Sequence, residues 1–154
     1  MPKGLEYMPF KKFERLFEPM INNPLPLFEF FKEGHKVNVL EVFIALVIFC
    51  HDAEYEDRVQ LIFNVFDVDG GGSLDRREVS KLLQATIYGL TKLAGIPSPP
   101  KTKVADFIAN MFSEIDEDGS GVVEYDELKS YIDNSMEIQD FILRYSRVQT
   151  IVRA

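Results

Sequence analysis

Apolar residues recur along much of the chain at the spacing of one face of an amphipathic helix. The two clearest stretches have apolar positions at i, i+3, i+4 and i+7 and end just before an aspartate; they are residues 59–66 and 104–115. Each is followed by an acidic stretch rich in glycine and then by a second helical pattern, in residues 79–90 and 128–132. The pattern therefore predicts two helix–loop–helix units.

Further helical patterns flank these two units. The spacing predicts helices over residues 10–20 and 38–50 before them, and an amphipathic helix over residues 137–152 after them. Three prolines within Pro97–Pro100 exclude a helix there and predict a stiff linker between the two units. Val42–Cys50 is the longest apolar run, and it is far shorter than the roughly 20 residues that span a bilayer.

The two acidic stretches share one arrangement of residue types. In Asp67–Glu78 and in Asp116–Glu127, acidic residues stand at positions 1, 3, 9 and 12, glycine at position 6 and an aliphatic residue at position 8. Both resemble the calcium loops of EF-hand proteins, in which oxygen ligands surround the ion and a final glutamate supplies two of them. The residues predicted to hold calcium are Asp67, Asp69, Ser73, Asp75, Glu78, Asp116, Asp118, Ser120, Val122, Glu124 and Glu127.

The two predicted sites differ at position 5. The second loop has Ser120 there, whose hydroxyl is a ligand, whereas the first loop has Gly71, which offers no side chain and stands among three consecutive glycines. We therefore expect two Ca²⁺ sites, of which Asp116–Glu127 is the stronger and Asp67–Glu78 the weaker. The alternative for each loop is an acidic, solvated turn between two helices.

The N-terminal third predicts a related unit that holds no ion. Setting Val37 at position 8 and Glu41 at position 12 gives a loop over residues 30–41. Positions 1 and 3 are then Phe30 and Lys32, which provide no carboxylate for calcium. We interpret this segment as a degenerate hand; a plain helical hairpin is the alternative.

These elements together predict an all-α fold of EF-hand helix–loop–helix pairs. Leu74 and Val123 both stand at position 8, so we expect a short antiparallel strand pairing between the two calcium loops. Leu5–Phe10 resembles the end of another loop, with Leu5 at position 8 and the entering helix missing. The predicted organisation is an N-terminal lobe with degenerate, non-binding hands (residues 1–52), a pair with both calcium loops (53–135) and the C-terminal amphipathic helix (136–154).

Residues 30–142 are similar to the calcium sensors grouped with the neuronal calcium sensors, calcineurin B and calaxin. Val37–Glu41, the helix Leu82–Leu90 and the long linker before the last loop carry this likeness. The resemblance implies a calcium sensor or adaptor that exposes an apolar groove and binds an amphipathic helix of a target protein. Residues predicted for this groove, although they can equally pack on one another, are Phe10, Phe13, Phe17, Phe43 and Phe49, whereas those expected in the core are Phe63, Phe66, Phe107 and Phe112.

Charge narrows the choice of partners. The chain carries 25 Asp and Glu against 17 Lys and Arg, a net charge of −8, which opposes binding to nucleic acid or to anionic lipid. We therefore expect neither a nucleic-acid partner nor a direct membrane anchor. The only cysteine, Cys50, has no partner for an internal disulfide, which favours a cytoplasmic location, cytoskeletal and ciliary positions included.

The sequence predicts no enzyme. His35 and His51 have no partner at metal-ligand spacing, and no nucleophile arrangement or phosphate-binding loop accompanies them. Two alternatives to a sensor remain open. One is a calcium buffer, which binds the ion but barely opens, and the other is the calmodulin-like regulatory fragment of a larger calcium-dependent enzyme such as a protein kinase.

Overall fold

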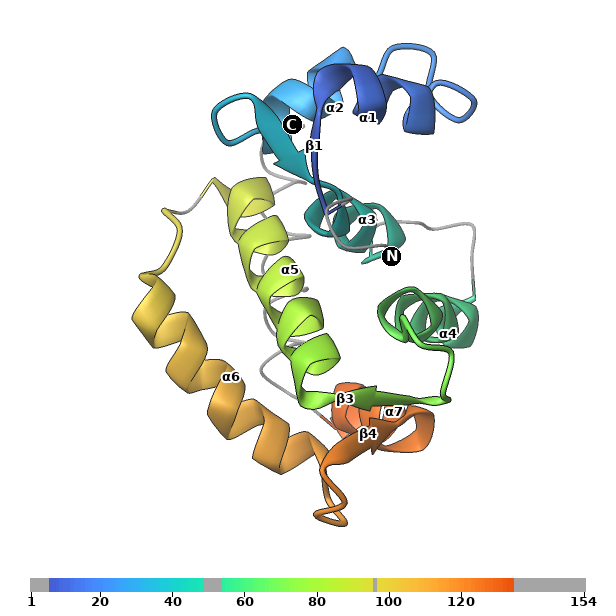
Figure 1. Ribbon diagram of the computed structural model, residues 1–154, viewed down its shortest axis with the longest axis vertical. Helices are drawn as coiled ribbons and strands as arrows, with labels where there is room; N and C mark the ends of the chain where they lie inside the picture. Colours follow the sequence, from blue (N-terminus) through green and yellow to red (C-terminus); the bar gives the residue numbers. More distant parts are fainter. Residues whose placement is uncertain (1–5, 49–53, 96, 135–154) are drawn as a thin grey trace, which may run out of the picture.

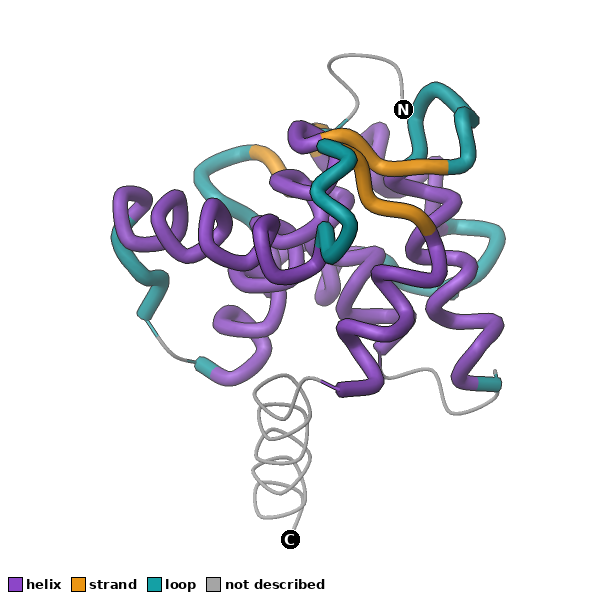
Figure 2. The backbone as a smooth tube through the Cα atoms, turned by 90° about the horizontal axis from the view of Figure 1, so that it is seen from below, coloured by secondary structure: helices purple, strands orange, loops and turns teal. Residues whose placement is uncertain are grey.

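The computed structural model describes residues 6–48, 54–95 and 97–134, and within them the chain is mostly helical, as predicted (Figure 2). Phe49 and the predicted helix over residues 137–152 lie outside the described residues. In chain order the elements are β1 (Tyr7–Pro9), α1 (Phe10–Phe17), α2 (Leu25–Phe31), β2 (Lys36–Asn38), α3 (Val39–Ile48), α4 (Tyr55–Phe66), β3 (Ser73–Asp75), α5 (Arg76–Ala94), α6 (Lys101–Ile115), β4 (Val122–Glu124) and α7 (Tyr125–Asn134).

The strands form two antiparallel pairs, each joining two helix–loop–helix units. β3 pairs with β4, and Leu74 stands opposite Val123, so the predicted pairing between the two calcium loops is confirmed. β1 pairs with β2, and Met8 stands opposite Val37. The two strand pairs lie at opposite ends of the molecule, and α5 runs between them (Figure 1).

The N-terminal strand pair corrects one predicted register. The half-loop prediction placed Leu5 at position 8, but Met8 is the residue opposite Val37, in the relation that Leu74 has to Val123. The predicted register is therefore wrong by three residues. The physical reason is that a strand takes its register from its partner, and the partner of β1 lies beyond α1 and α2 in the chain.

The first complete hand has a shorter loop than the two calcium hands. Phe30, predicted at loop position 1, belongs to helix α2, because the apolar aromatic run extends this helix to the end of the run. Only Lys32–His35 separate α2 from β2, whereas Asp67–Gly72 separate α4 from β3. Glu33 and Lys36 exchange two backbone hydrogen bonds of 2.8 and 3.3 Å, which close a tight hairpin where a calcium loop would wrap around its ion.

Two hydrophobic cores share helix α3, which is apolar on nearly all sides. One core lies around β1–β2 and takes Val39, Val42 and Ala45 from α3. The other lies among α4, α5, α6 and α7 and takes Leu40 and Ile44. Because successive turns of one helix feed both cores, the two strand pairs are packed into a single body.

Helix α5 connects the two ends of this body. It begins with a capping box, in which the Glu78 amide donates to Asp75 Oδ1 at 2.8 Å and the Asp75 amide donates to Glu78 Oε2 at 2.9 Å. It ends at Gly95, whose φ of +67° is the left-handed conformation typical of a helix stop. None of the described helices is long and apolar enough to cross a bilayer.

Candidate metal centre

Three carboxylates of the first acidic loop converge on one point. Asp67, Asp69 and Glu78 each offer an oxygen, and these oxygens lie within 4.8 Å of one another. Backbone amides orient them, since Gly72 donates to Asp67 Oδ2 and Gly71 donates to Asp69 Oδ1, both at 2.9 Å. The loop thus folds its own amides toward the carboxylates and leaves the remaining carboxylate oxygens facing one another.

One carboxylate oxygen of this cluster lacks a hydrogen bond. Asp67 Oδ1 is buried and finds no donor within the described part of the chain, while Oδ2 of the same group is satisfied. A buried carboxylate oxygen without a donor is costly, because it has lost its water and gained no partner. A cation among Asp67, Asp69 and Glu78 would satisfy it, so the residues present fit a hard divalent ion.

The second acidic loop forms a matching cluster. Asp116, Asp118 and Glu127 offer oxygens within 4.8 Å of one another. The Ser120 amide donates to Asp118 Oδ1 at 3.0 Å, and the Ser120 hydroxyl donates to the carbonyl oxygen of Val122, also at 3.0 Å. The structure thereby brings together the groups that the motif assigns to ligand positions 1, 3, 5, 7 and 12.

Both glutamates at position 12 are held by amides of their own loops. Glu78 accepts from the amides of Val68 at 3.1 Å and Asp75 at 2.9 Å, one on each carboxylate oxygen. Glu127 likewise accepts from the amides of Asp118 at 3.5 Å and Glu124 at 3.0 Å. Each glutamate therefore presents its carboxylate edge-on to the loop, the orientation that two-oxygen binding of an ion requires.

The residues at positions 7 and 9 lie in the strand pair. Ser73 stands opposite Glu124, and Asp75 stands opposite Val122. Asp75 is also the N-cap of α5, so its carboxylate is already engaged by a backbone amide. The ligand that the motif expects from position 7 is a backbone carbonyl, which either residue type can supply.

The two loops have the same backbone shape at their glycines. Gly70 and Gly72 have φ of +67° and +83°, and Gly119 and Gly121 have φ of +66° and +85°. These left-handed conformations at positions 4 and 6 favour glycine over residues with a Cβ. The predicted difference in strength between the two sites therefore has no counterpart in the backbone.

Hydrogen bonds to the backbone also tune the exposed carboxylates. The amide of Gly71 is the main cause that lowers the pKa of Asp69, and the amide of Ser120 is the main cause that lowers the pKa of Asp118. Both carboxylates thus stay ionised at neutral pH although other acids stand beside them. Each loop presents a concentrated negative charge, which attracts a divalent cation.

The segment that carries both clusters matches a known family. The family model of the EF-hand domain pair covers residues 56–133, which are 78 of the 154 residues. The chain belongs to the EF-hand family. This EF-hand pair comprises α4 to α7 with both acidic loops, and the predicted calcium-binding class is confirmed at the level of the family.

Relatives of this EF-hand chain are mostly longer proteins. It is 28% identical over 141 residues to lysophosphatidylcholine acyltransferase 2 of Danio rerio, which covers 91% of the chain but 24% of the acyltransferase. It is 28% identical over 100 residues to calcium and calcium/calmodulin-dependent serine/threonine-protein kinase of Lilium longiflorum, covering 65% of the chain and 18% of the kinase. Calcineurin B type 2 of Dictyostelium discoideum is 23% identical over 122 residues, 79% of the chain and 62% of that protein. The chain spans less than two thirds of each relative.

The phenylalanines predicted for a groove lie largely inside the EF-hand chain. Phe13 and Phe17 are 0% and 5% exposed, and their ring centroids are 4.4 Å apart. Phe10 is partly buried against the same core, and Phe43 is partly buried against the other. In the conformation described, Phe13 and Phe17 offer no surface to a partner, which matches the alternative that these residues pack on one another.

The residues expected in the core follow the prediction with one exception. Phe63, Phe66 and Phe112 are buried, but Phe107 is 43% exposed, so its assignment to the core is wrong. The inward positions of α6 at this level are taken by Ile108 and Met111, and Phe107 lies to one side of them on the helix.

The structure also reveals a charged contact that sequence reasoning missed. Lys92 forms ion pairs with Glu41 and Glu33 in the first, ion-free hand. No local signal marks this contact, because Lys92 and Glu41 are 51 residues apart in the chain. The only sequence feature that points toward it is Glu41 itself, a carboxylate at position 12 of a loop with no other calcium ligand.

Proposed function

We propose that the protein is a calcium sensor, which binds Ca²⁺ at both acidic loops and then binds an amphipathic helix of a target protein. The observation that carries the first step is the buried Asp67 Oδ1, which lacks a donor and stands among three converging carboxylates. Membership of the EF-hand family supports the same step. The ligands in this proposal are Asp67, Asp69, Ser73, Asp75 and Glu78 in one loop and Asp116, Asp118, Ser120, Val122, Glu124 and Glu127 in the other.

The ligand set favours calcium over magnesium. Glu78 and Glu127 can each give two oxygens, which suits the six to eight ligands of Ca²⁺ better than the strict octahedron of Mg²⁺. We propose that Asp116–Glu127 is the stronger site. Ser120 contributes a hydroxyl that already contacts Asp116 Oδ1 at 3.3 Å, whereas Gly71 at the same position contributes only its backbone.

The target-binding step rests on the similarity to a protein whose name places it in calcineurin, and on apolar side chains that face solvent. Leu61 on α4 is 47% exposed and Phe107 on α6 is 43% exposed, both within the EF-hand pair. Calcium-driven rearrangement of these helices would enlarge such apolar surface, as sensor hands do. The partner in this proposal is a helix with an apolar face; nucleic acid and a direct membrane anchor are not part of it.

A second candidate is the regulatory part of a larger calcium-dependent enzyme. The specific observation in its favour is that the chain matches only 24% of an acyltransferase and 18% of a protein kinase. In that case the target helix would belong to the same polypeptide. Under both candidates the described chain acts as a calcium-binding regulator in the cytoplasm and catalyses no reaction itself.

A calcium titration in the presence of a dye that fluoresces on apolar surfaces tests the proposal. With magnesium held at about 1 mM, we expect the dye signal to rise at calcium concentrations of about 10⁻⁷ to 10⁻⁵ M, the range of sensor hands. The variant Glu127→Gln should weaken the stronger site at least about tenfold, or about 1.4 kcal/mol, because an amide gives one neutral ligand oxygen in place of two charged ones.

Glu114→Gln is the matched control, because Glu114 is exposed on α6 and lies outside both loops. This variant should titrate like the native chain. Calcium binding detected by calorimetry without any rise in dye signal would support a buffer and contradict the sensor. No heat of binding in the native chain would overturn the calcium sites themselves.

A further inference from the structure

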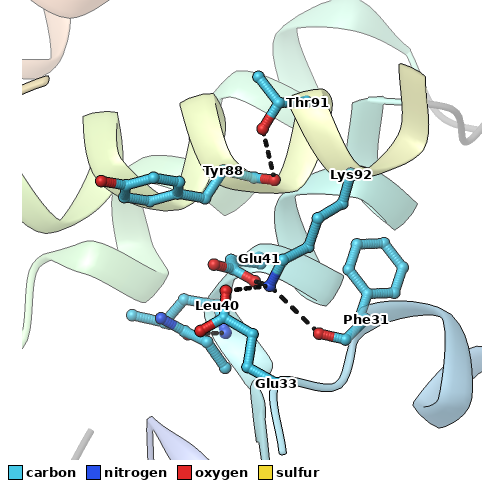
Figure 3. A network of polar contacts seen from close by, with 8 residues as sticks. Phe31, Glu33, Leu40, Glu41, Tyr88, Thr91 and Lys92 are labelled. Atoms are coloured by element: carbon cyan, nitrogen blue, oxygen red, sulfur yellow. Dashed lines mark hydrogen bonds and ion pairs between the residues drawn. The ribbon is translucent and has the colours of Figure 1, made fainter. Parts of the chain in front are cut away.

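The ammonium group of Lys92 sits among three oxygens of the first, ion-free hand (Figure 3). Its Nζ lies 2.6 Å from Glu41 Oε2, 3.0 Å from Glu33 Oε1 and 3.2 Å from the carbonyl oxygen of Phe31. The side chain of Glu41 is 4% exposed and that of Lys92 is 14% exposed. The ion pair is therefore largely withdrawn from water, where such a contact is stronger than on the surface.

The position of this cation within the hand matches that of the ion in a calcium hand. The central residues of β2, β3 and β4 are equivalent, because each stands at the middle of its strand pair. Four residues after each of them, in the first turn of the exiting helix, stand Glu41, Glu78 and Glu127. In the calcium hands this glutamate closes the ion site, whereas in the first hand it closes on Lys92.

The short hairpin of this hand explains why an ammonium suits it. Lys32–His35 are too few to wrap around an ion and supply six or more oxygens. An ammonium has three hydrogen-bond donors, and the hand supplies three acceptors, from Glu41, Glu33 and Phe31. Burial alone would lower the pKa of Lys92, but the two carboxylates outweigh burial and raise it, so the group stays charged.

Lys92 reaches this hand from a helix that begins in a calcium loop. Its helix α5 carries Glu78 in the first turn and Lys92 in the last. Between these ends α5 is held against the N-terminal elements, because a Cβ on Gly89 would lie 3.0 Å from the carbonyl oxygen of Glu41, and Lys81 pairs with Glu6. A helix fixed at its far end and along one side keeps its first turn in place.

We propose that the ammonium of Lys92 is the resident cation of the first hand, and that by fixing α5 it acts as a positioning residue for the calcium site of Asp67–Glu78. The second part rests on the proposed calcium binding, whereas the first part does not. Glu78 is the ligand that profits, since α5 holds it ready while the loop closes on the ion. The loop Asp116–Glu127 ends in α7 and has no such anchor among the described residues.

The cation role is tested without calcium, by a double-mutant cycle in urea unfolding. Lys92→Met alone leaves the buried Glu41 carboxylate without its strongest partner, and Glu41→Gln alone leaves the ammonium without its own, so each should lower the unfolding midpoint. The double variant Lys92→Met/Glu41→Gln should recover most of this loss. Additive losses would overturn the cation role. Lys103→Met, an exposed lysine on α6, is the control and should leave the midpoint unchanged.

The positioning role is tested by calcium titration of the double variant, which removes both charges and so avoids a stranded one. The amides of Gly72 and Gly121 are separate reporters, since each donates to the first aspartate of its own loop at 2.9 Å. In nuclear magnetic resonance spectra, the calcium concentration at the Gly72 midpoint should rise about three- to tenfold, and that of Gly121 should stay unchanged.

Each contrary result has a distinct meaning. Equal shifts at Gly72 and Gly121, or no shift at either, would overturn the positioning role while leaving calcium binding intact. If neither amide of the native chain responded to calcium, the proposed function would fail and the positioning role would fail with it. The unfolding cycle would still decide the cation role in that case.

Discussion

The residue at position 5 marks the clearest chemical difference between the two calcium loops. Ser120 contacts Asp116 Oδ1 and the carbonyl oxygen of Val122 through its hydroxyl, so it already belongs to the ring of oxygens. Gly71 reaches the cluster only through its amide, which donates to Asp69 Oδ1. The first loop therefore has one ligand fewer, although its backbone follows the same path.

Gly71→Asp should strengthen calcium binding at the first loop, by about three- to tenfold. Gly71 has an ordinary negative φ, and a Cβ there would lie 3.1 Å from the side-chain oxygen Oδ1 of Asp69, which is exposed and able to move by a few tenths of an ångström. The added carboxylate also repels its neighbours in the calcium-free protein, so the unfolding free energy without calcium should fall. Isothermal calorimetry and urea unfolding measure the two effects.

Gly71→Ala separates the ligand from the loss of glycine, because it adds the Cβ without an oxygen. The alanine variant should show no gain in calcium affinity. A gain of equal size in both variants would mean that loop stiffness limits binding, and no gain in either would mean that position 5 is not the limiting ligand.

At the scale of elements, the close approach of α3 and α5 depends on Gly89. This residue is buried in the middle of α5, where glycine is normally unfavourable by about 1 kcal/mol relative to alanine. Its use here follows from the backbone of α3, since the carbonyl oxygen of Glu41 would lie 3.0 Å from an added Cβ. The missing side chain lets Lys92, one turn further along, reach Glu41.

Gly89→Ala should therefore destabilise the protein, although alanine is the better helix former. Backbone atoms of α3 have to move to admit the methyl group, and the contacts of Lys92 lengthen when they do. Comparing Gln84→Gly with Gln84→Ala gives the reference, because Gln84 is exposed on the same helix and should show the usual preference for alanine. An unfolding free energy for Gly89→Ala that rises by the same amount as at residue 84 would contradict the close packing.

Elements defined by local pattern were predictable, and those defined by distant partners were not. The helices on both sides of Asp67 and Asp116, and the pairing of Leu74 with Val123, follow from motifs contained in about twelve consecutive residues. The register of β1 depends on a strand beyond two helices, so Leu5 was chosen where Met8 pairs. The role of Lys92 depends on how α5 packs against α3, which no short window of sequence contains.

At the scale of the whole molecule, helix α3 argues against two independent lobes. The predicted organisation divides the chain at residue 52, between α3 and α4, and it remains a prediction. Yet Leu40 and Ile44 of α3 lie in the core of the calcium-binding pair, while Val42 lies in the core around β1–β2. A helix whose opposite faces fill two cores makes each core depend on the other, so we expect one cooperative unfolding transition.

Ile44→Ala tests this expectation, because Ile44 is 1% exposed and belongs to the core of the calcium-binding pair. The cavity should lower the unfolding free energy by about 2–5 kcal/mol. Hydrogen exchange should accelerate in parallel at β3–β4 and at β1–β2, because loss of α3 packing on one side loosens the helix that both cores share. Leu46→Ala is the control on the same helix, since Leu46 is 41% exposed and its truncation leaves no comparable cavity. Faster exchange confined to β3–β4 would mean that the β1–β2 end folds on its own, and α5 with Lys92 would then join two domains rather than brace one.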